Sequence, residues 1–486
     1  MRRPLPKIVF AFALAVLQLT APMGAVHGAV YMANGIKIGE VHRDRAIVWT
    51  RLTRAPERNA DGIPFPEVDG GRNSGAGLST ADLTGGYPLD AMEGAVPGTA
   101  GLVQIAWWPA GKPEETKQTS WLPVDRDRDF TCQHLLENLQ PATIYEVRVQ
   151  GKSDAESEVS CSVEGRFKTA PPPEEPATVS FVVVTCGDYP RRDDPEMGHK
   201  IYDAMLRLNP DFFVHTGDIE YYDKPLPWAP NQELARFKWN RIFAMPYQRR
   251  FHCNVTSYFM KDDHDTLRND CWPGQTYGEL TWEQGLAIFR EQVPMGEKTY
   301  RTIRWGKDLQ VWLVEGRDFR SPNSMPDGPD KTIWGAEQKA WFKRTVAESD
   351  ATFRVLISPT PVVGPDRDNK TDNHANRAFA HESNELRQFM ASMKNMVVIN
   401  GDRHWQYVSV DDETGLYEFG TGPSSDEHAG GWRQDDLRPE HRYLNLKGGF
   451  LHVTVTRESG APRMVLRHRS VTGDLYNEVT LPVEQI

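Results

Sequence analysis

The sequence predicts an α/β fold, with a layered α/β domain preceded by a smaller all-β domain. Over residues 29–170, apolar residues form short runs that are rich in β-branched and aromatic side chains, as in strands. From residue 178 onward, short apolar runs alternate with segments whose apolar residues recur at helical spacing. This alternation predicts sheets covered by helices rather than a second all-β module.

The N-terminal residues 1–28 have the three parts of a secretory signal peptide. Three basic residues within the first seven positions precede an apolar run over residues 8–19, and small residues follow around 25–29. The apolar run is shorter than the roughly 20 residues of a transmembrane helix, and no later segment is apolar enough to span a bilayer. We therefore expect an extracytoplasmic protein, secreted or periplasmic, without a membrane span.

The charge balance excludes some partners and leaves others open. With 56 basic and 67 acidic residues the formal net charge is −11. An acidic chain repels long polyanions, so general nucleic-acid binding is not expected. Small anions could still bind at a metal site, whose charge dominates locally. The sequence does not indicate an oligomeric state.

Five cysteines in an exported chain predict two disulfides and one free thiol. Cys132 and Cys161 flank strand-like segments of the first domain, and Cys253 and Cys271 flank a later loop. Both pairs are candidate bridges, although the sequence does not fix the connectivity. Cys186 is then the remaining free thiol.

The first domain, residues 29–170, is predicted to contain strands within 36–51, 103–108 and 144–149. The segment 139–147 resembles the fibronectin type III pattern, with Tyr145 in the place of a corner tyrosine. Residues 54–101 form a Gly/Pro-rich insertion, and a loop of this length is either functional or mobile. The insertion could cover the cleft of the following domain. Residues 171–177 are Pro-rich and polar, which is typical of a stiff linker.

Polar side chains follow four predicted strands of the second domain, residues 178–486, at the point where each strand ends. The four groups are Cys186 and Asp188; Asp218 and Tyr221; Asp262, Asp263, His264 and Asp265; and Asp402 and His404. A single Gly-Asp turn carries little information. Because active sites of open α/β sheets collect at the carboxyl ends of strands, the four groups together predict a metal site at one edge.

The regular elements around these groups are also predicted. Strands are expected at 179–185, 212–214, 255–260, 309–314, 353–357 and 396–399, and helices at 197–208, 233–243, 282–292, 337–347 and 385–393. The C-terminal residues 450–481 are rich in β-forming side chains.

The order Cys…Gly-Asp-x-x-Tyr…Asp-Asp-His-Asp…Gly-Asp-x-His resembles the calcineurin-like metallophosphoesterases, and within them the alkaline phosphatase D (PhoD-like) family. Residues 300–306 and 335–341 are similar to further motifs of that family. The resemblance covers about residues 179–410. It implies a metallophosphoesterase β-sandwich flanked by helices, with a multinuclear metal centre at one edge.

The resemblance also implies roles for individual residues. Asp218 corresponds to the carboxylate that bridges two metals, and Cys186 and Tyr221 correspond to ligands of the first metal, ferric iron. Asp263 corresponds to a ligand of the second metal, Ca²⁺. The remaining positions carried over are Asp402 and His404 as the last metal-binding pair and His264 as the neighbouring active-site histidine.

These residue types suit that chemistry. Thiolate and phenolate are anionic donors appropriate to iron, whereas carboxylates favour a hard ion such as Ca²⁺. Zn²⁺ or Mn²⁺ are alternatives. Two cations would clamp a phosphoryl group and lower the pKa of a bound water that attacks phosphorus in line.

The sequence departs from the family pattern at several positions. Metallophosphoesterases often have a histidine after the strand that corresponds to 353–357, but this chain has Ser-Pro-Thr-Pro there. A ligand is missing, or Asp402 compensates for it. His374, in a polar loop, is a candidate ligand or substrate contact, with a solvated loop as the alternative. Glu315 stands where the family commonly has Asp.

Arginines next to the motifs are candidates for phosphate binding, because a guanidinium can hold phosphate oxygens. They are Arg317 and Arg403. We expect an exported, metal-dependent phosphoesterase that hydrolyses small phosphomonoesters or phosphodiesters. The alternatives are a metal-dependent hydrolase of another ester or anhydride, and a non-catalytic binding protein with a degenerate site.

Overall fold

The structure is a computed structural model that describes residues 28–482. The predicted signal peptide lies almost entirely outside this range and stays a prediction. Within residues 28–482, no helix is long and apolar enough to cross a membrane.

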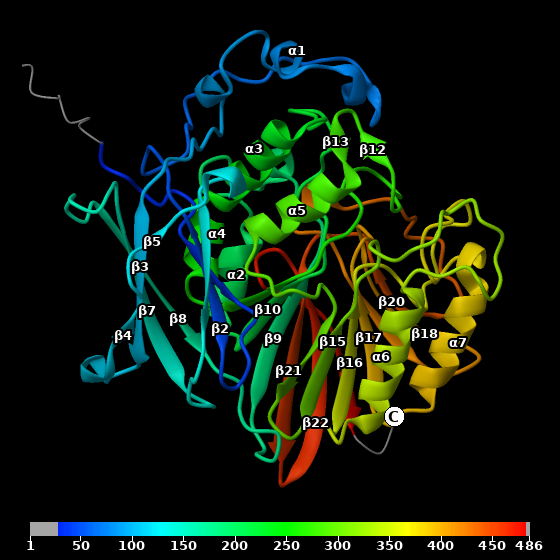
Figure 1. Cartoon of the computed structure of the whole chain (residues 1–486). Helices are drawn as coiled ribbons and strands as arrows, with labels where there is room; N and C mark the ends of the chain where they lie inside the picture. Colours follow the sequence, from blue (N-terminus) through cyan, green and yellow to red (C-terminus); the bar gives the residue numbers. More distant parts are fainter. Residues whose placement is uncertain (1–27, 483–486) are drawn as a thin grey trace, which may run out of the picture.

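Two large sheets form the centre of the molecule (Figure 1). The nine-stranded sheet has the order β23 (Leu475–Pro482), β22 (Ala461–Arg469), β21 (Phe450–Glu458), β9 (Val179–Val184), β10 (Phe212–His215), β11 (Thr256–Phe259), β1 (Ile36–Gly39), β2 (Ala46–Arg51) and β6 (Thr131–Leu136). The seven-stranded sheet has the order β14 (Arg301–Trp305), β15 (Leu309–Leu313), β16 (Phe353–Ser358), β17 (Met396–Asn400), β19 (Tyr417–Thr421), β18 (Gln406–Val410) and β20 (His441–Asn445).

Parallel strands occupy the middle of both sheets. In the first sheet β9, β10 and β11 are parallel, and in the second β15, β16, β17 and β19 are parallel. Parallel neighbours end on the same side of their sheet, so the loops after them are brought together.

The main core lies between the two sheets. Successive side chains of a strand point to opposite faces. In β9, Phe181 and Val183 pack in the core between the sheets, whereas Val182 and Val184 pack against helices on the other face. Strand β16 behaves in the same way, with Val355 facing the opposite sheet and Leu356 facing helices. The predicted β-sandwich flanked by helices is confirmed.

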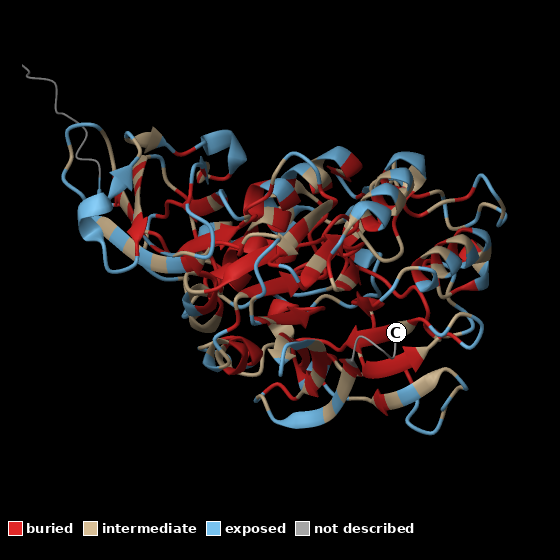
Figure 2. Cartoon of the chain, turned by 90° about the horizontal axis from the view of Figure 1, so that it is seen from below, coloured by how far each residue is buried: buried red, intermediate tan, exposed pale blue. Residues whose placement is uncertain are grey.

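Helices cover the outer face of each sheet (Figure 1). The nine-stranded sheet is covered by α2 (Ile201–Arg207), α3 (Gln232–Phe243), α4 (Pro246–His252) and α5 (Trp282–Gln292), and the seven-stranded sheet by α6 (Gly335–Glu348) and α7 (Ala380–Ala391). Figure 2 shows the central strands of the sheets largely buried and the outward helix surfaces exposed. Helix α5 has the predicted bounds and begins with a capping box between Thr281 and Gln284.

The N-terminal region contributes to two sheets. A smaller sheet contains β3 (Leu102–Pro109), β4 (Lys117–Gln118), β5 (Leu122–Pro123), β7 (Ile144–Lys152) and β8 (Cys161–Lys168). Strands β1, β2 and β6 instead extend the nine-stranded sheet, because β1 pairs in parallel with β11. The predicted corner tyrosine is present, since the backbone N–H of Gln140 donates to the Tyr145 hydroxyl at 2.8 Å.

The insertion over residues 54–101 lies across the helices of the nine-stranded sheet (Figure 1). It contains one short α-helix, α1 (Thr80–Thr84), and two 3-10 helices, Ser74–Gly77 and Leu89–Ala91, joined by turns and irregular backbone. Phe65 and Met92 pack against Phe237 of α3, and Leu83 joins the core beneath these helices. Near the small hairpin of β12 (Thr276–Tyr277) and β13 (Leu280–Thr281), the Tyr277 hydroxyl donates to the backbone carbonyl of Arg72.

The expectation of two disulfides is wrong, because all five cysteines are free. Cys132 and Cys161 belong to strands of different sheets, β6 and β8. Cys253 follows α4, whereas the buried Cys271 thiol donates to the backbone carbonyl of Asp263 at 3.4 Å. Cys132 and Cys161 pack against one core cluster without a bond between them, whereas Cys253 and Cys271 belong to different clusters.

Candidate metal centre

Three of the predicted ligands lie just beyond strands, in turns with an unusual backbone. Cys186 follows β9, Asp218 follows β10 and Asp402 follows β17, with φ of 53°, 57° and 62°. Residues other than glycine seldom adopt this left-handed conformation, and when they do it often marks a functional site. Gly217 allows the loops after β10 and β11 to meet, because a Cβ there would lie 2.5 Å from the backbone nitrogen of Asp262.

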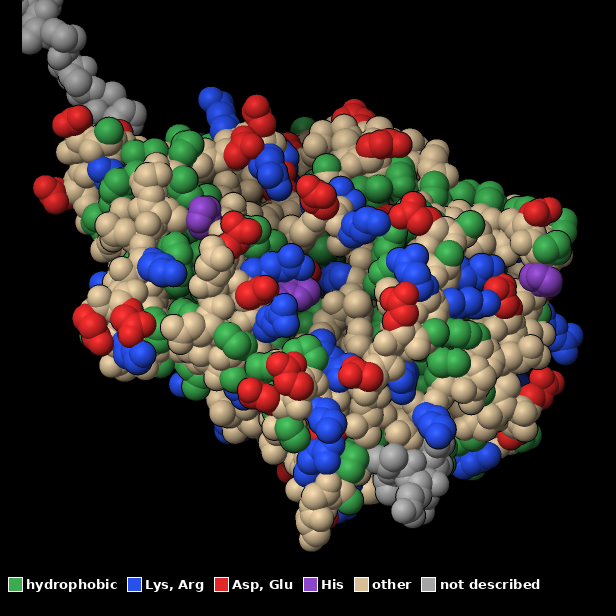
Figure 3. Space-filling view, turned by 60° about the horizontal axis from the view of Figure 1, so that its bottom comes forward, with side chains coloured by type: hydrophobic (Ala, Val, Ile, Leu, Met, Phe, Trp, Pro, Cys, Tyr) green, Lys and Arg blue, Asp and Glu red, His purple; other side chains and the backbone are tan. Residues whose placement is uncertain are grey.

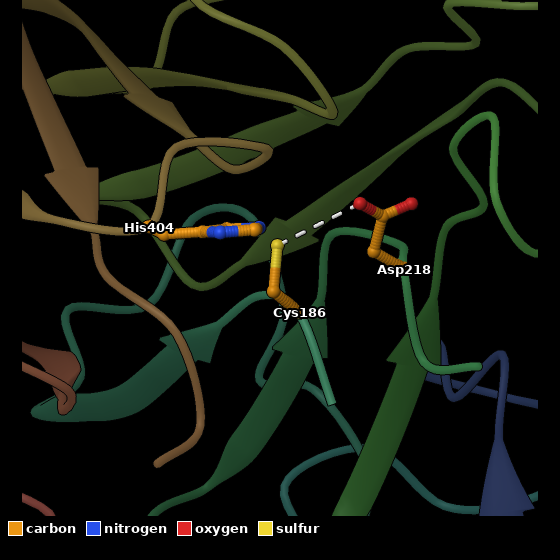
Figure 4. A group of neighbouring side chains, drawn as sticks. All are labelled: Cys186, Asp218 and His404. Carbon is orange, nitrogen blue, oxygen red and sulfur yellow. Dashed lines mark hydrogen bonds between the residues drawn. The ribbon is translucent and has the colours of Figure 1, made fainter. Parts of the chain in front are cut away.

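A thiol, a carboxylate and an imidazole converge at this edge of the sheets (Figure 4). One potential ligand atom from each of Cys186, Asp218 and His404 lies within 4.8 Å of the others. The Cys186 Sγ donates to Asp218 Oδ2 at 3.7 Å. The Tyr221 hydroxyl donates to the same oxygen at 3.2 Å and lies 3.3 Å from His404 Nε2. Four of the predicted donors are thus neighbours, and His404, predicted only as part of the last metal-binding pair, lies beside the donors predicted for the first metal.

Carboxylates gather on the other side of Asp218. Asp218 forms a second group with Asp263 and His264 and a third with Asp262 and Asp402, again with atoms within 4.8 Å of one another. Asp218 belongs to all three groups, which is the position that a bridging ligand would occupy. Asp262 is an addition to the predicted set.

The electrostatics of the cluster fit metal cations. Burial and the neighbouring Asp263 raise the pKa of Asp218 well above its usual range. Burial also raises the pKa of Asp402 to about 6, partly offset by Arg403. The buried Asp262 Oδ2 accepts no hydrogen bond from the part of the chain that the structure describes. Crowded buried carboxylates are costly unless cations offset their repulsion, and hard cations prefer oxygen ligands.

The protonation of the other donors also suits a metal. Burial, and then the nearby Lys224 and Arg191, lower the pKa of His404 well below its usual range, so its imidazole is neutral as a metal ligand requires. Burial and Asp218 raise the pKa of Cys186 and of Tyr221. These two groups become anionic when a bound cation replaces their protons.

His264 has a carboxylate partner that the sequence did not indicate. Its Nδ1 lies 2.6 Å from Oδ1 of Asp223, which is fully buried and also accepts the backbone N–H of Asn269 at 2.9 Å. This contact orients the imidazole and leaves Nε2 as the nitrogen that can reach the cavity that His264 lines. His264 is also close to Tyr221, with ring centroids 4.3 Å apart.

The candidate phosphate-binding arginines are both buried and ion-paired. Arg317 Nε donates to Asp262 at 2.5 Å, and Arg317 Nη2 lies 3.8 Å from Asp263. Arg403 Nη2 lies 2.7 Å from Asp366 and 2.9 Å from Asp402, and Arg403 also lines the cavity. Both guanidiniums therefore hold carboxylates of the site, and direct phosphate contact by Arg403 stays a prediction.

The loop that carries His374 is buried rather than solvated. His374 Nε2 lies 3.0 Å from Glu382 of α7, and its ring packs edge-on against Trp334. Glu315, at a position that departs from the family pattern, accepts a hydrogen bond from Lys261 Nζ at 2.9 Å. The other departure from the family pattern is the missing histidine after residues 353–357. At that edge of the sheet Asp402 lies in one ligand group with Asp218.

His428 is a further residue that the sequence did not single out. It is buried, its ring centroid lies 4.2 Å from that of His404, and its Nδ1–H donates to the Gly187 carbonyl at 2.9 Å. Its Nε2 accepts from Lys224 Nζ at 3.4 Å. The available signal was the segment 417–421, in which Tyr417 and Phe419 alternate with other residues as in a strand; it forms β19 beside β17 and is followed by Gly422.

A cavity of about 440 Å³ opens beside this centre. Asp218, His264, Asp402 and His404 line it together with several basic side chains. This volume is within the usual range of small-molecule sites, and the cavity places a ligand directly against the cluster of donors.

Comparisons with known proteins identify the family. A sequence model of PhoD-like phosphatases matches residues 181–475, and a model of the N-terminal domain of PhoD-like phosphatases matches residues 19–171. No curated protein sequence matches the chain.

Two solved structures share the fold. One is described as the structure of PhoD; it is 17% identical, with a TM-score of 0.69, over 95% of this chain and 90% of that one. The other is the purple acid phosphatase PPD1 from yellow lupin (Lupinus luteus) seeds, 12% identical, with a TM-score of 0.60, over 92% of this chain and 74% of that one. The family match confirms the expectation of a metal-dependent phosphatase. The chain belongs to the PhoD-like phosphatase family.

Proposed function

We propose that this protein is an exported phosphoesterase that hydrolyses small phosphomonoesters or phosphodiesters at a centre of ferric iron and calcium. The observation that carries the proposal is the convergence of Cys186, Asp218, Tyr221 and His404 beside a second, carboxylate-rich group around the same Asp218. A donor set that contains thiolate, phenolate and imidazole, next to an oxygen-only set, suits two metals of different kinds.

Each donor set favours one metal. Cys186, Tyr221, His404 and Asp218 would hold iron, because thiolate and phenolate stabilise the ferric state. Asp218, Asp263 and Asp402 would hold calcium through carboxylate oxygens, with Asp262 adjacent. When bound, the metals supply Lewis-acid chemistry, polarising phosphoryl oxygens and lowering the pKa of water.

The side chains around the metals would position the substrate and move the proton. His264 is held by Asp223 with Nε2 available to the cavity, so it is placed to donate a proton to the leaving-group oxygen. Arg403 and Arg317 would hold Asp402 and Asp262 in place, and each guanidinium partly offsets the rise that burial causes in the pKa of its partner carboxyl. The two arginine–aspartate pairs are largely buried, so the ester would enter the site through the cavity.

Export rests on the N-terminal sequence pattern, which is typical of a secretory leader. N-terminal sequencing of protein recovered from the culture medium or periplasm, after expression of the full chain, should find a start near residue 29. A protein retained in the cytoplasm with its first residues intact would contradict export.

The activity and the metals are tested together. Purified protein should release nitrophenol from p-nitrophenyl phosphate or bis(p-nitrophenyl) phosphate, and elemental analysis should find iron and calcium. A phenolate bound to ferric iron absorbs visible light, so the protein should be coloured. Tyr221→Phe should bleach the colour and weaken iron retention, whereas Tyr476→Phe, at an exposed tyrosine, should do neither.

The rival metal is zinc, which also accepts Cys, Asp and His ligands. Colourless, fully active protein with a zinc equivalent would overturn the iron assignment and leave the phosphoesterase assignment intact. Metal-loaded protein that cleaves neither nitrophenyl ester would contradict the phosphoesterase assignment itself.

A further inference from the structure

Basic side chains outnumber acidic ones around the cavity beside the metal centre. Its lining includes Arg72, Arg191, Lys224, Arg367, Lys370 and Arg403, against the carboxylates of Asp218 and Asp402. The chain as a whole has the opposite balance, with a net charge of −11. On the face seen in Figure 3, Lys and Arg side chains stand interspersed with Asp and Glu. The excess of positive charge is therefore a local property of the cavity.

Four of these six basic side chains form ion pairs with neighbouring carboxylates. Arg403 pairs with Asp366 and Asp402, and Lys370 pairs with Asp270. Arg191 lies 3.5 Å from Asp188, and Arg367 lies 3.6 Å from Asp366. Arg72 and Lys224 are different, because within residues 28–482 neither forms an ion pair. These two cations are available to a ligand.

Arg72 and Lys224 are both held near the reacting centre. Lys224 is half-buried, with Nζ 3.4 Å from the ring centroid of Tyr221 and within hydrogen-bond distance of His428. Arg72 comes from the insertion of the N-terminal region, where its guanidinium donates to the side chain of Asn269 and its carbonyl accepts from Tyr277. The insertion thus delivers a cation to the cavity of the catalytic domain.

The phosphoryl group undergoing hydrolysis does not require these two cations. The metals and His264 would bind that group. The cavity of about 440 Å³ is larger than one phosphoryl group needs. A second anionic group on the same substrate would meet Arg72 and Lys224, since guanidinium and ammonium groups bind phosphate and carboxylate oxygens.

We propose that this cavity contains a subsite for a second anionic group, so that the preferred substrates are small phosphate esters carrying a further phosphate or carboxylate group. The inference rests on the proposed phosphoesterase function and narrows its substrate class. Arg72 and Lys224 are the specificity-determining contacts.

Matched substrate pairs test the subsite. Fructose 1,6-bisphosphate and fructose 6-phosphate differ by one phosphate group, and 3-phosphoglycerate and glycerol 3-phosphate differ by a carboxylate in place of a hydroxymethyl group. Wild-type protein should favour the more anionic member of at least one pair by roughly tenfold in kcat/KM, mainly through KM, because the second anionic group takes no part in the bond that is broken. The pair that shows the preference identifies the second group as phosphate or carboxylate.

Variants assign the preference to the two cations. Arg72→Ala should lower the ratio of the two kcat/KM values severalfold, and Arg72→Lys should restore most of it because the charge is retained. Lys224→Gln should also lower the ratio. The matched control is Arg344→Ala, which removes an exposed guanidinium of α6 that lies outside the cavity. Raising the ionic strength should reduce the wild-type ratio, since salt screens exposed charges.

The outcomes separate this inference from the proposed function. Equal kcat/KM values within both pairs, or a ratio that Arg72→Ala and Lys224→Gln leave unchanged, would overturn the subsite while hydrolysis of p-nitrophenyl phosphate upholds the phosphoesterase. Failure of metal-loaded protein to cleave p-nitrophenyl phosphate, bis(p-nitrophenyl) phosphate and all four physiological esters would overturn both.

Discussion

Asp223 should control the activity of His264 without holding metal. Its side chain is fully buried, and Oδ1 lies 2.6 Å from His264 Nδ1. Burial raises the pKa of Asp223, but the charge and hydrogen bond of His264 outweigh it and leave this pKa below its usual value. Asp223 is therefore ionised at neutral pH. Asp223→Asn keeps the size and an acceptor oxygen but removes the charge.

The size of the effect follows from this contact. A hydrogen bond to a charged group contributes about 1.5–3 kcal/mol, and each 1.36 kcal/mol changes a rate tenfold, so turnover should fall by roughly 10- to 150-fold. Because the charge on Asp223 would stabilise His264 during proton transfer, kcat and kcat/KM should fall together. Metal content should stay near normal, since Asp223 belongs to none of the three ligand groups.

Steady-state kinetics with elemental analysis measure both quantities, and Asp435→Asn, at an exposed aspartate, is the matched control. In a His264→Ala background, Asp223→Asn should cause little further loss, because residues that act as a unit are not additive. A full additional loss in that background, or unchanged turnover in the single variant, would refute the coupling of Asp223 to His264.

Three other outcomes are expected. His264→Ala should lower turnover by about 10²–10⁴-fold with metal content near normal; loss of a metal equivalent would instead make His264 a ligand. Cys186→Ala should lose iron and colour but retain calcium, and denaturation without reductant should expose five reactive thiols, which a single disulfide would reduce to three. Burial raises the pKa of Glu382, but the His374 hydrogen bond and charge outweigh it and hold that pKa at about 2. A depressed folded-state pKa stabilises the fold above the unfolded value near 4.5 and loses that contribution as the pH falls toward 2, so Glu382→Gln should lower Tm more at pH 6 than at pH 3.

Local patterns made the strand ends predictable. The apolar runs that become β9, β10 and β17 are short and bounded by Gly and polar residues, and parallel strands bring the residues beyond their ends to one edge. The sequence pattern alone was therefore enough to predict that Cys186, Asp218 and His404 lie near one another, as they do.

Contacts that depend on tertiary packing were not predictable in this way. Asp223 lies in the irregular segment after β10 and contacts His264 beyond β11. His428 ends a short 3-10 helix, and only tertiary packing brings it to Gly187 beyond β9. Extension of the nine-stranded sheet by β1 depends on pairing with β11, more than 200 residues away in the chain. The cysteine count predicted disulfides from composition alone, whereas disulfide formation depends on geometry.

Backbone hydrogen bonds between the strand-end loops hold the ligands in register with one another. The N–H groups of Cys186 and Gly187 donate to the carbonyls of Gly217 and Asp218, and the N–H of Asp402 donates to the Thr185 hydroxyl. These bonds use main-chain atoms, or a side chain outside the ligand set. They persist when a ligand side chain is replaced, so such a substitution should cost metal affinity rather than the fold.

The same network explains how ligand residues can keep left-handed backbones. Such a conformation is costly for a residue with a Cβ, and it persists only where the surroundings fix it. At Cys186 and Asp218 the fixing groups belong to each other's loops, since the loop after β9 donates to the loop after β10. The two sheets, by holding these loops at a common edge, thus set the ligand geometry in advance of metal binding.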